Sequence, residues 1–260
     1  MALFPLKDDT PLKTISFQYV TVSLIGLNVI AFLWELTQPD QDRMVYALGA
    51  IPAVIFGFAD LPPTIATIPE WASLFTSLFL HGGWMHLLGN MLFLWIFGDN
   101  VEDSMGHLRY LVFYLLCGVL ATLMHAIVQP TSEAPLIGAS GAISGVLGAY
   151  LVLHPRARLL VLFMSIIPLR LPAWIVLGSW IGLQVLNLNN AASDVAWWAH
   201  IGGFIVGAIL IVPFRRTGVP LFDFTTKGDP IVVQRQETRH ARSIFPNTVD
   251  PRVRRGGPWG

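Results

Sequence analysis

The stretch Leu136-Ile-Gly-Ala-Ser-Gly-Ala-Ile-Ser-Gly-Val-Leu-Gly-Ala-Tyr-Leu-Val-Leu153 is an apolar segment without a charged residue. Its length approaches the roughly 20 apolar residues that a helix needs to cross the hydrocarbon core of a bilayer. Gly141, Gly145 and Gly148 recur along one helical stripe, and small residues let membrane helices approach one another closely. The stretch therefore predicts a transmembrane helix packed tightly against a neighbour, with Ser140 near one end.

The composition of the whole chain indicates a membrane protein. Hydrophobic residues make up 54% of the 260 residues and charged residues only 12%, whereas soluble domains carry about 25% charged residues. The formal net charge is zero, so there is no broad basic field and nucleic-acid binding is not expected. The single cysteine, Cys117, lies inside an apolar run, which excludes a disulfide framework and a cysteine-based metal site.

Six segments are apolar and long enough, or nearly so, to be membrane-spanning helices. They cover residues 15–36, 84–98, 108–128, 136–153, 171–188 and 195–214. Two shorter apolar pieces, residues 46–58 and 159–167, cannot cross as helices and are expected to be interfacial or re-entrant. The sequence thus predicts an all-α membrane protein with six spans and a large first loop.

The predicted membrane domain covers residues 15–214, between a short N-terminal segment (1–14) and a C-terminal tail (215–260). The first apolar run is too long for the apolar region of a signal peptide and lacks a small-residue cleavage site, so it is expected to be a retained span. The tail is rich in Arg, Pro, Thr and Asp and lacks a helical apolar stripe. It is therefore expected to be mobile and cytoplasmic.

The distribution of Lys and Arg predicts the orientation, because cytoplasmic loops carry an excess of positive charge. Eight basic residues close to the span ends lie on one side of the six spans: Lys7, Lys13, Arg109, Arg156, Arg158, Arg170, Arg215 and Arg216. On the other side, the loops 129–135 and 189–194 contain no Lys or Arg, and the long loop 37–83 contains only Arg43. Both termini are therefore predicted to be cytoplasmic and the large first loop to face outward.

Polar side chains gather at the outer ends of three predicted spans. His86 and Asn90 are four residues apart and share one face of the second span. Ser140 lies near the start of the fourth span, and His200 precedes the glycine stripe of the sixth by one turn. Close approach of the fourth and sixth spans would allow a hydrogen bond between Ser140 and His200. A water-filled pocket open to the outer side would explain these polar residues.

Each of these residues also has a structural explanation when it is taken alone. A serine in a glycine-rich membrane helix more often packs or donates to a backbone carbonyl, and a lone histidine can bind a proton or an ion. A transporter would be expected to show an inverted repeat with broken helices at the midplane, and the sequence contains no such repeat. Taken together, however, these residues share a similar depth in the membrane and lie on helix faces that can meet. This agreement favours a catalytic site.

Three motifs resemble those of the rhomboid intramembrane proteases. They are His81-Gly-Gly-Trp-Met-His-Leu-Leu-Gly-Asn90, Gly138-Ala-Ser-Gly141 and Ala199-His-Ile-Gly-Gly203, and they occur in the family's order on the corresponding spans. The loop 98–110 is also similar to the family's loop. The resemblance implies a six-helix rhomboid-type bundle with both termini inside.

The resemblance also implies the chemical roles. Ser140 would be the nucleophile and His200 the general base, while His86, Asn90 and the backbone N–H of Ser140 would surround the oxyanion. Possible supporting residues are His81, Gly138, Gly141 and Gly203. Since no carboxylate lies at a depth that could orient His200, a Ser-His dyad is expected rather than a triad.

The implied function is a serine endopeptidase that cuts transmembrane proteins in the lipid bilayer without a metal or other cofactor. The implied location is a bacterial-type plasma membrane, which the chain would cross several times.

Two positions depart from the family pattern: Ala72 follows Trp71 where the family often has arginine, and Ser144 replaces an aromatic residue that packs under the histidine ring. The alternative is an inactive rhomboid-fold protein that binds membrane clients, and the presence of both Ser140 and His200 favours the enzyme.

Overall fold

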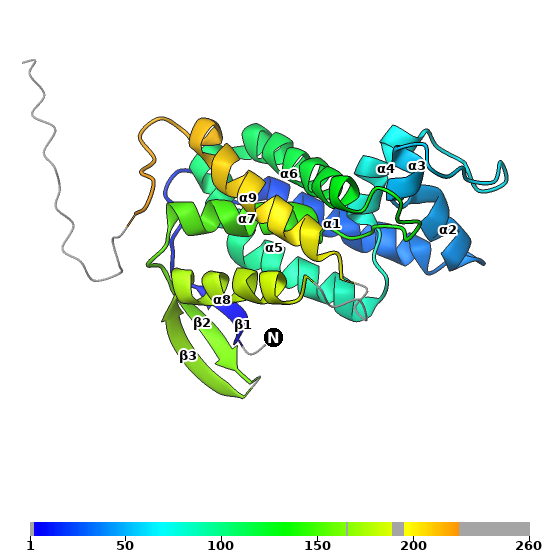
Figure 1. Ribbon diagram of the computed structural model, residues 1–260. Helices are drawn as coiled ribbons and strands as arrows, with labels where there is room; N and C mark the ends of the chain where they lie inside the picture. The colour runs from blue at the N-terminus through cyan, green and yellow to red at the C-terminus, as the bar shows by residue number, and fades with distance from the viewer. Residues whose placement is uncertain (1–2, 165, 189–194, 224–260) are drawn as a thin grey trace, which may run out of the picture. The chain divides into compact units, whose positions relative to one another are not determined.

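The computed structural model describes residues 3–164, 166–188 and 195–223, and this part of the chain is mostly helical (Figure 1). The helices are α1 (Tyr19–Glu35), α2 (Gln41–Leu48), α3 (Pro52–Ile55), α4 (Glu70–Thr76), α5 (Trp84–Met105), α6 (His107–Val128), α7 (Ser140–Leu153), α8 (Ala173–Leu186) and α9 (Trp197–Phe214), with a 3₁₀ turn, η1 (Ser77–Phe79). The loop 189–194 and residues 224–260 of the predicted tail lie outside the described residues.

The long helices α1 and α5 to α9 lie where the sequence predicts spans. Within the described residues, α6 and α9 are long and apolar enough to cross a membrane, judged by length and composition, while α1, α7 and α8 are shorter apolar helices. Helix α5 extends beyond the predicted end at residue 98 and stops before Gly106, whose φ of 84° favours glycine. Gly98 therefore lies inside the helix rather than at its end. It allows close packing there, because a Cβ on residue 98 would lie 2.7 Å from the hydroxyl of Tyr110.

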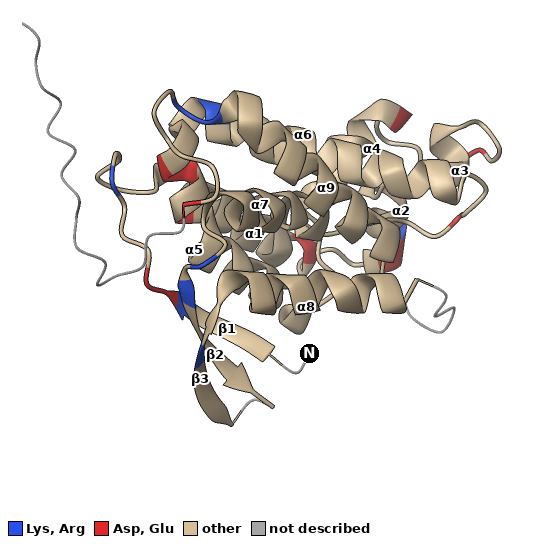
Figure 2. Cartoon of the chain, turned by 60° about the vertical axis from the view of Figure 1, so that its left-hand side comes forward, with Lys and Arg blue, Asp and Glu red and all other residues tan. Residues whose placement is uncertain are grey.

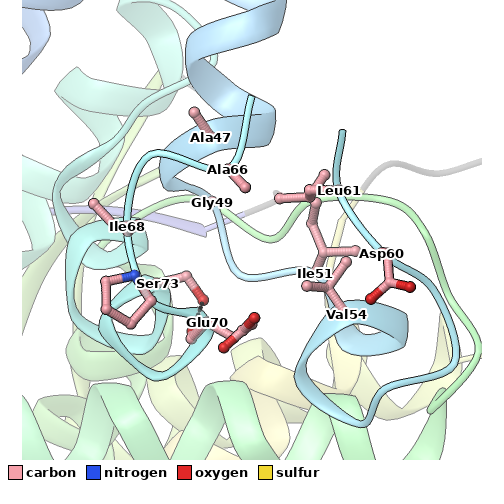
Figure 3. A pocket seen from close by; sticks show the side chains of 11 residues that line it. Ala47, Gly49, Ile51, Val54, Asp60, Leu61, Ala66, Ile68, Glu70 and Ser73 are labelled. Carbon is pink, nitrogen blue, oxygen red and sulfur yellow. Dashed lines mark hydrogen bonds between the residues drawn. The ribbon is translucent and has the colours of Figure 1, made fainter. Parts of the chain in front are cut away.

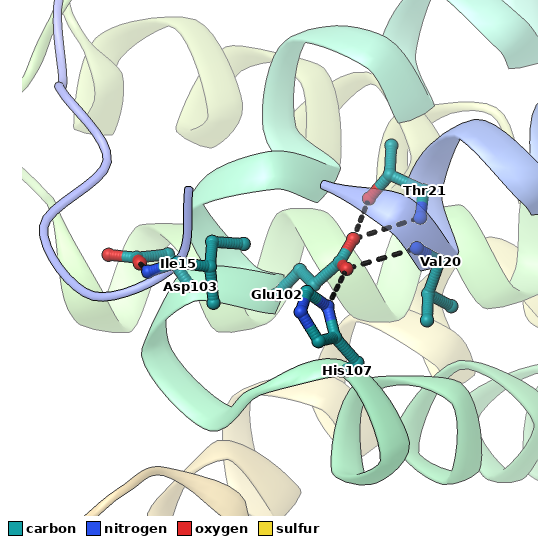
Figure 4. Close-up of polar contacts among 6 residues, drawn as sticks. All are labelled: Ile15, Val20, Thr21, Glu102, Asp103 and His107. Atoms are coloured by element: carbon teal, nitrogen blue, oxygen red, sulfur yellow. Dashed lines mark hydrogen bonds and ion pairs between the residues drawn. The ribbon is translucent and has the colours of Figure 1, made fainter. Parts of the chain in front are cut away.

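Two buried carboxylates fix the start of α1 against the α5–α6 turn (Figure 4). Glu102 accepts hydrogen bonds from the backbone N–H and the hydroxyl of Thr21 at 2.9 and 2.7 Å, and it contacts His107 Nδ1 at 2.6 Å. Asp103 accepts from the backbone N–H of Ile15 at 2.6 Å. These bonds satisfy N–H groups at and before the first turn of α1, which have no partner within the helix.

The prediction of an all-α protein is wrong in one respect, because the structure contains a three-stranded antiparallel sheet. Its strands are β1 (Leu3–Asp8), β2 (Arg158–Phe163) and β3 (Ile167–Pro172), in the order β1-β2-β3. The piece 159–167, expected to be interfacial or re-entrant, forms most of β2 and includes the first residue of β3. Leu159 and Val161 are fully buried and alternate with less buried neighbours. The sequence hid this alternation because both faces of β2 are apolar.

Helix α7 lies at the centre of the bundle and packs closely against α9, as the glycine pattern predicts. A Cβ added at Gly203 would overlap the carbonyl group of Gly141, and one added at Gly207 would overlap that of Gly145. Larger residues would force the two backbones apart. This contact sets the distance between the start of α7 and the start of α9.

Candidate active site

Ser140 and His200 form a hydrogen-bonded pair across the α7–α9 contact. Ser140 is the first residue of α7, and His200 lies in the first turn of α9. The Oγ of Ser140 is 2.9 Å from the Nε2 of His200. A hydroxyl can therefore pass its proton directly to an imidazole, which is the arrangement that activates a serine nucleophile.

Both residues line a cavity of about 630 Å³. Its wall also includes His86 and Asn90 from α5, residues 135–137, and Trp180 from α8. This volume is within the usual range of about 300 to 1,000 Å³ for a ligand site. The structure therefore brings together, on one cavity, the four polar residues that the sequence predicts to converge.

Asn90 and His86 face the turn that leads into Ser140. The Nδ2 of Asn90 is buried and has no hydrogen-bond partner among the described residues. The backbone N–H of Gly82 donates to the Nδ1 of His86 at 3.4 Å. Nε2 is therefore the ring nitrogen of His86 that remains for another contact. A Cβ on Gly138 would lie 2.7 Å from His86 Nε2 and 3.7 Å from Asn90 Nδ2, and the φ of Gly138 is 118°. Glycine is required at this turn for both reasons.

The amino end of α7 adds backbone donors to this group. The first N–H groups of a helix have no carbonyl partner within it, and the helix dipole favours negative charge at this end. Since α7 begins at Ser140, its first turn borders the position where an anion would form. Ser144, one turn later, donates from its hydroxyl to the carbonyl of Ser140 at 2.6 Å.

The other predicted supporting residues have structural contacts. His81 does not line the cavity. Its Nδ1 lies 3.3 Å from the carbonyl of Phe79, and its backbone N–H donates to Glu35 at 3.2 Å. Burial, with a smaller effect of the neighbouring His86, lowers the pKa of His81 to about 4. His81 is therefore neutral at pH 7 and braces the segment before α5, while Gly141 and Gly203 belong to the α7–α9 contact.

One neighbour of His200 was missed by sequence reasoning, which considered carboxylates alone. The Oε1 of Gln184, in α8, is 2.8 Å from His200 Nδ1. The ring of Trp180 also lies beside the imidazole, with centroids 5.9 Å apart and planes inclined by 36°. The aromatic neighbour that Ser144 does not supply thus comes from a different helix. The only signal in the sequence was that two amide residues, Gln184 and Asn187, lie within the apolar span 171–188.

A second, smaller cavity of about 90 Å³ lies in the long loop between α1 and α5 (Figure 3). Asp60 and Glu70 contribute carboxylates to its wall, and none of the predicted site residues line it. Within the described part of the chain, no group of three or more His, Cys, Asp or Glu side chains could hold a metal ion.

Comparisons with known proteins agree on one family. Residues 69–217 match the Rhomboid domain. The chain is 27% identical over 223 residues to "Rhomboid protein 1, mitochondrial" of Saccharomyces cerevisiae, covering 73% of this chain and 62% of that protein. It is 36% identical over 138 residues to "Rhomboid protease GluP" of Bacillus subtilis, covering 53% and 25% respectively. It is 32% identical over 160 residues to "RHOMBOID-like protein 12, mitochondrial" of Arabidopsis thaliana, covering 55% of this chain and 46% of that protein. The chain thus spans less than two thirds of each of these relatives.

Proposed function

Because the chain belongs to the rhomboid family and is an integral membrane protein, we propose that it is an intramembrane serine endopeptidase. In this proposal it hydrolyses peptide bonds in or near transmembrane segments of other membrane proteins. The observation that carries the proposal is the 2.9 Å contact between Ser140 Oγ and His200 Nε2 on the wall of the large cavity.

The geometry supports a two-step reaction. Ser140 Oγ attacks the carbonyl carbon of the substrate while its proton passes to Nε2 of His200. His200 then gives this proton to the leaving amine, and an acyl-enzyme remains on Ser140. Water entering the cavity gives a proton to His200 and attacks the ester carbon; the acyl–Oγ bond then breaks, His200 returns the proton to Ser140 Oγ, and the second product leaves as a carboxylic acid. Because the hydrocarbon core holds almost no water, the cavity must open to an aqueous face.

The developing oxyanion has three sources of donors in this proposal: Asn90, His86 and the first turn of α7. The unpartnered Nδ2 of Asn90 is a buried amide donor that costs free energy unless a partner arrives. A transition-state oxyanion would provide that partner, and fixed donors of this kind stabilise developing charge.

The alternative is a rhomboid-fold protein that binds membrane clients without cutting them. Its site would not need a hydrogen-bonded nucleophile and base. The retention of the Ser140–His200 contact favours the enzyme, as does the name of one relative, a rhomboid protease.

A serine-reactive fluorophosphonate tests the proposed function on purified protein in detergent. We expect the wild type to be labelled and Ser140→Ala to be unlabelled, because the reagent needs an activated hydroxyl. Ser144→Ala is the matched control, since Ser144 lies one turn away and uses its hydroxyl for a helix carbonyl. Absence of labelling in folded wild-type protein, detected by gel fluorescence, would favour the client-binding alternative.

We also propose that α1 and α5 to α9 all span the bilayer, with both termini in the cytoplasm. Figure 2 shows Lys and Arg gathered around the sheet and the α5–α6 turn, with one near α2. Cytoplasmic faces carry such an excess of positive charge. Ser140 and the start of α9 would then lie at the outward ends of their helices.

Cysteine labelling tests this orientation. In a Cys117→Ala background, Thr131→Cys and Thr217→Cys place single thiols at exposed positions between α6 and α7 and after α9. We expect a membrane-impermeant thiol reagent to label Thr131→Cys in intact cells, and Thr217→Cys only after permeabilisation. The reverse pattern would place the proposed active site toward the cytoplasm.

The substrate class and the membrane follow from different observations. Transmembrane proteins are the proposed substrates because the large cavity lies among the membrane helices. The bacterial-type plasma membrane expected from the sequence gains no support from the relatives. Their names include mitochondrial proteins of yeast and Arabidopsis beside the Bacillus protease, so the proposal is an integral membrane location without a choice of membrane.

A further inference from the structure

The imidazole of His200 is held on both ring nitrogens. Its Nε2 contacts Ser140 at 2.9 Å, and its Nδ1 contacts the Oε1 of Gln184 at 2.8 Å. Gln184 is buried, with 6% of its surface exposed. The ring of Trp180, on the same helix as Gln184, lies against one side of the imidazole.

The orientation of the Gln184 amide is fixed by a second contact. Its Nε2 donates to the carbonyl of Trp180 at 3.1 Å. A carbonyl can only accept a hydrogen bond, so it requires the NH₂ end of the amide, and the oxygen end must face His200. An amide oxygen can only accept in turn, and therefore His200 must carry its proton on Nδ1. In the neutral ring, Nε2 is then the nitrogen with a free lone pair, directed at Ser140.

We propose that Gln184 is a positioning residue that selects the tautomer and fixes the ring of His200, so that the dyad acts as a Ser-His-Gln arrangement. This inference rests on the proposed function. After His200 takes the serine proton, the amide oxygen also faces the N–H of the resulting imidazolium and stabilises its charge. A neutral amide thus takes the place for which sequence reasoning sought a carboxylate.

A purely structural role for Gln184 would rest on its bond to the Trp180 carbonyl. Asn187, which directly follows the last residue of α8, makes the same kind of bond, donating to the carbonyl four residues earlier, Leu183, at 2.8 Å. Asn187 is half-buried, and no contact among the described residues joins it to His200. It is therefore a matched control for the loss of such a bond.

Three substitutions separate the two roles. Gln184→Met has a similar shape and removes both the acceptor and the donor. Gln184→Glu keeps an oxygen acceptor for His200 and removes the donor to Trp180. Gln184→Asn keeps the amide but is one methylene too short to reach His200, and it provides a second loss variant if Met disturbs folding. Each is compared with the wild type and with Asn187→Leu in the full chain.

We expect Gln184→Met and Gln184→Asn to lower the rate of fluorophosphonate labelling and kcat on a transmembrane substrate by about 10 to 100-fold, because a misoriented base costs rate of this order. KM should change by less than about threefold, since substrate contacts remain. Gln184→Glu and Asn187→Leu should stay within about threefold of the wild-type rate. Thermal unfolding of each variant verifies that it is folded.

The outcomes distinguish this inference from the proposed function. If the folded wild type is not labelled, the proposed function fails. If the wild type is labelled and a folded Gln184→Met or Gln184→Asn reacts equally fast, only the positioning role fails. Equal losses in Gln184→Glu and Gln184→Met would also overturn it, because they would assign the effect to the lost bond to Trp180.

Discussion

Alanine at Ser140 or at His200 is expected to reduce cleavage of a transmembrane substrate by about a thousandfold or more. The first substitution removes the nucleophile, and the second removes the base that lies 2.9 Å from it. Because the two groups act as a unit, the double variant should be little slower than either single variant. The measurement is the rate of substrate cleavage in liposomes, followed by gel electrophoresis.

Thermal unfolding must show that each of these variants is folded. A chelator serves as a further control, and we expect it to leave the wild-type rate unchanged, since no step of the proposed chemistry takes place on a metal ion. Substantial cleavage by folded Ser140→Ala would contradict the serine mechanism. Multiplicative losses in the double variant would show that the two residues act independently.

The helices and the dyad were predictable because their signals are local or periodic. Long apolar runs report membrane helices, and the glycine stripes of 141 to 148 and 203 to 207 report a close helix pair. The structure contains that close pair and places the starts of α7 and α9 within hydrogen-bond distance. These stripes, together with the matching depth of Ser140 and His200 at the outer ends of their spans, predict that the two residues pair.

The sheet and Gln184 were not predictable, for two physical reasons. Strand β2 pairs with β1, which is more than 150 residues away in the sequence, and no local pattern encodes such pairing. Gln184 lies on a helix whose rotation about its own axis depends on packing. Nothing in an apolar span with two amides, Gln184 and Asn187, reveals that Gln184 is the one that faces His200. The first reason explains why the all-α prediction was wrong, and the second explains why the sequence did not reveal Gln184 as a neighbour of the Ser140–His200 pair.

Asn90→Ala is expected to lower kcat by about 100 to 1,000-fold, with a much smaller change in KM. The Nδ2 of Asn90 is buried without a partner among the described residues and lies near the turn that enters Ser140. A donor held in this way gains its partner when the carbonyl oxygen becomes an oxyanion, so its loss should slow turnover rather than weaken binding. The measurement is steady-state cleavage over a range of substrate concentrations in liposomes.

Asn100→Ala is the matched control for this prediction, because Asn100 is another buried asparagine on α5. Its side chain donates to Asp8 at 2.8 Å, in a contact with β1 that is separate from the cavity. We expect Asn100→Ala to lower thermal stability and to leave kcat within about threefold of the wild type. If Asn90→Ala instead raises KM by the factor expected for kcat, Asn90 holds the substrate in its ground state. The oxyanion would then depend on His86 and the first turn of α7, and the unpartnered amide would be a binding contact.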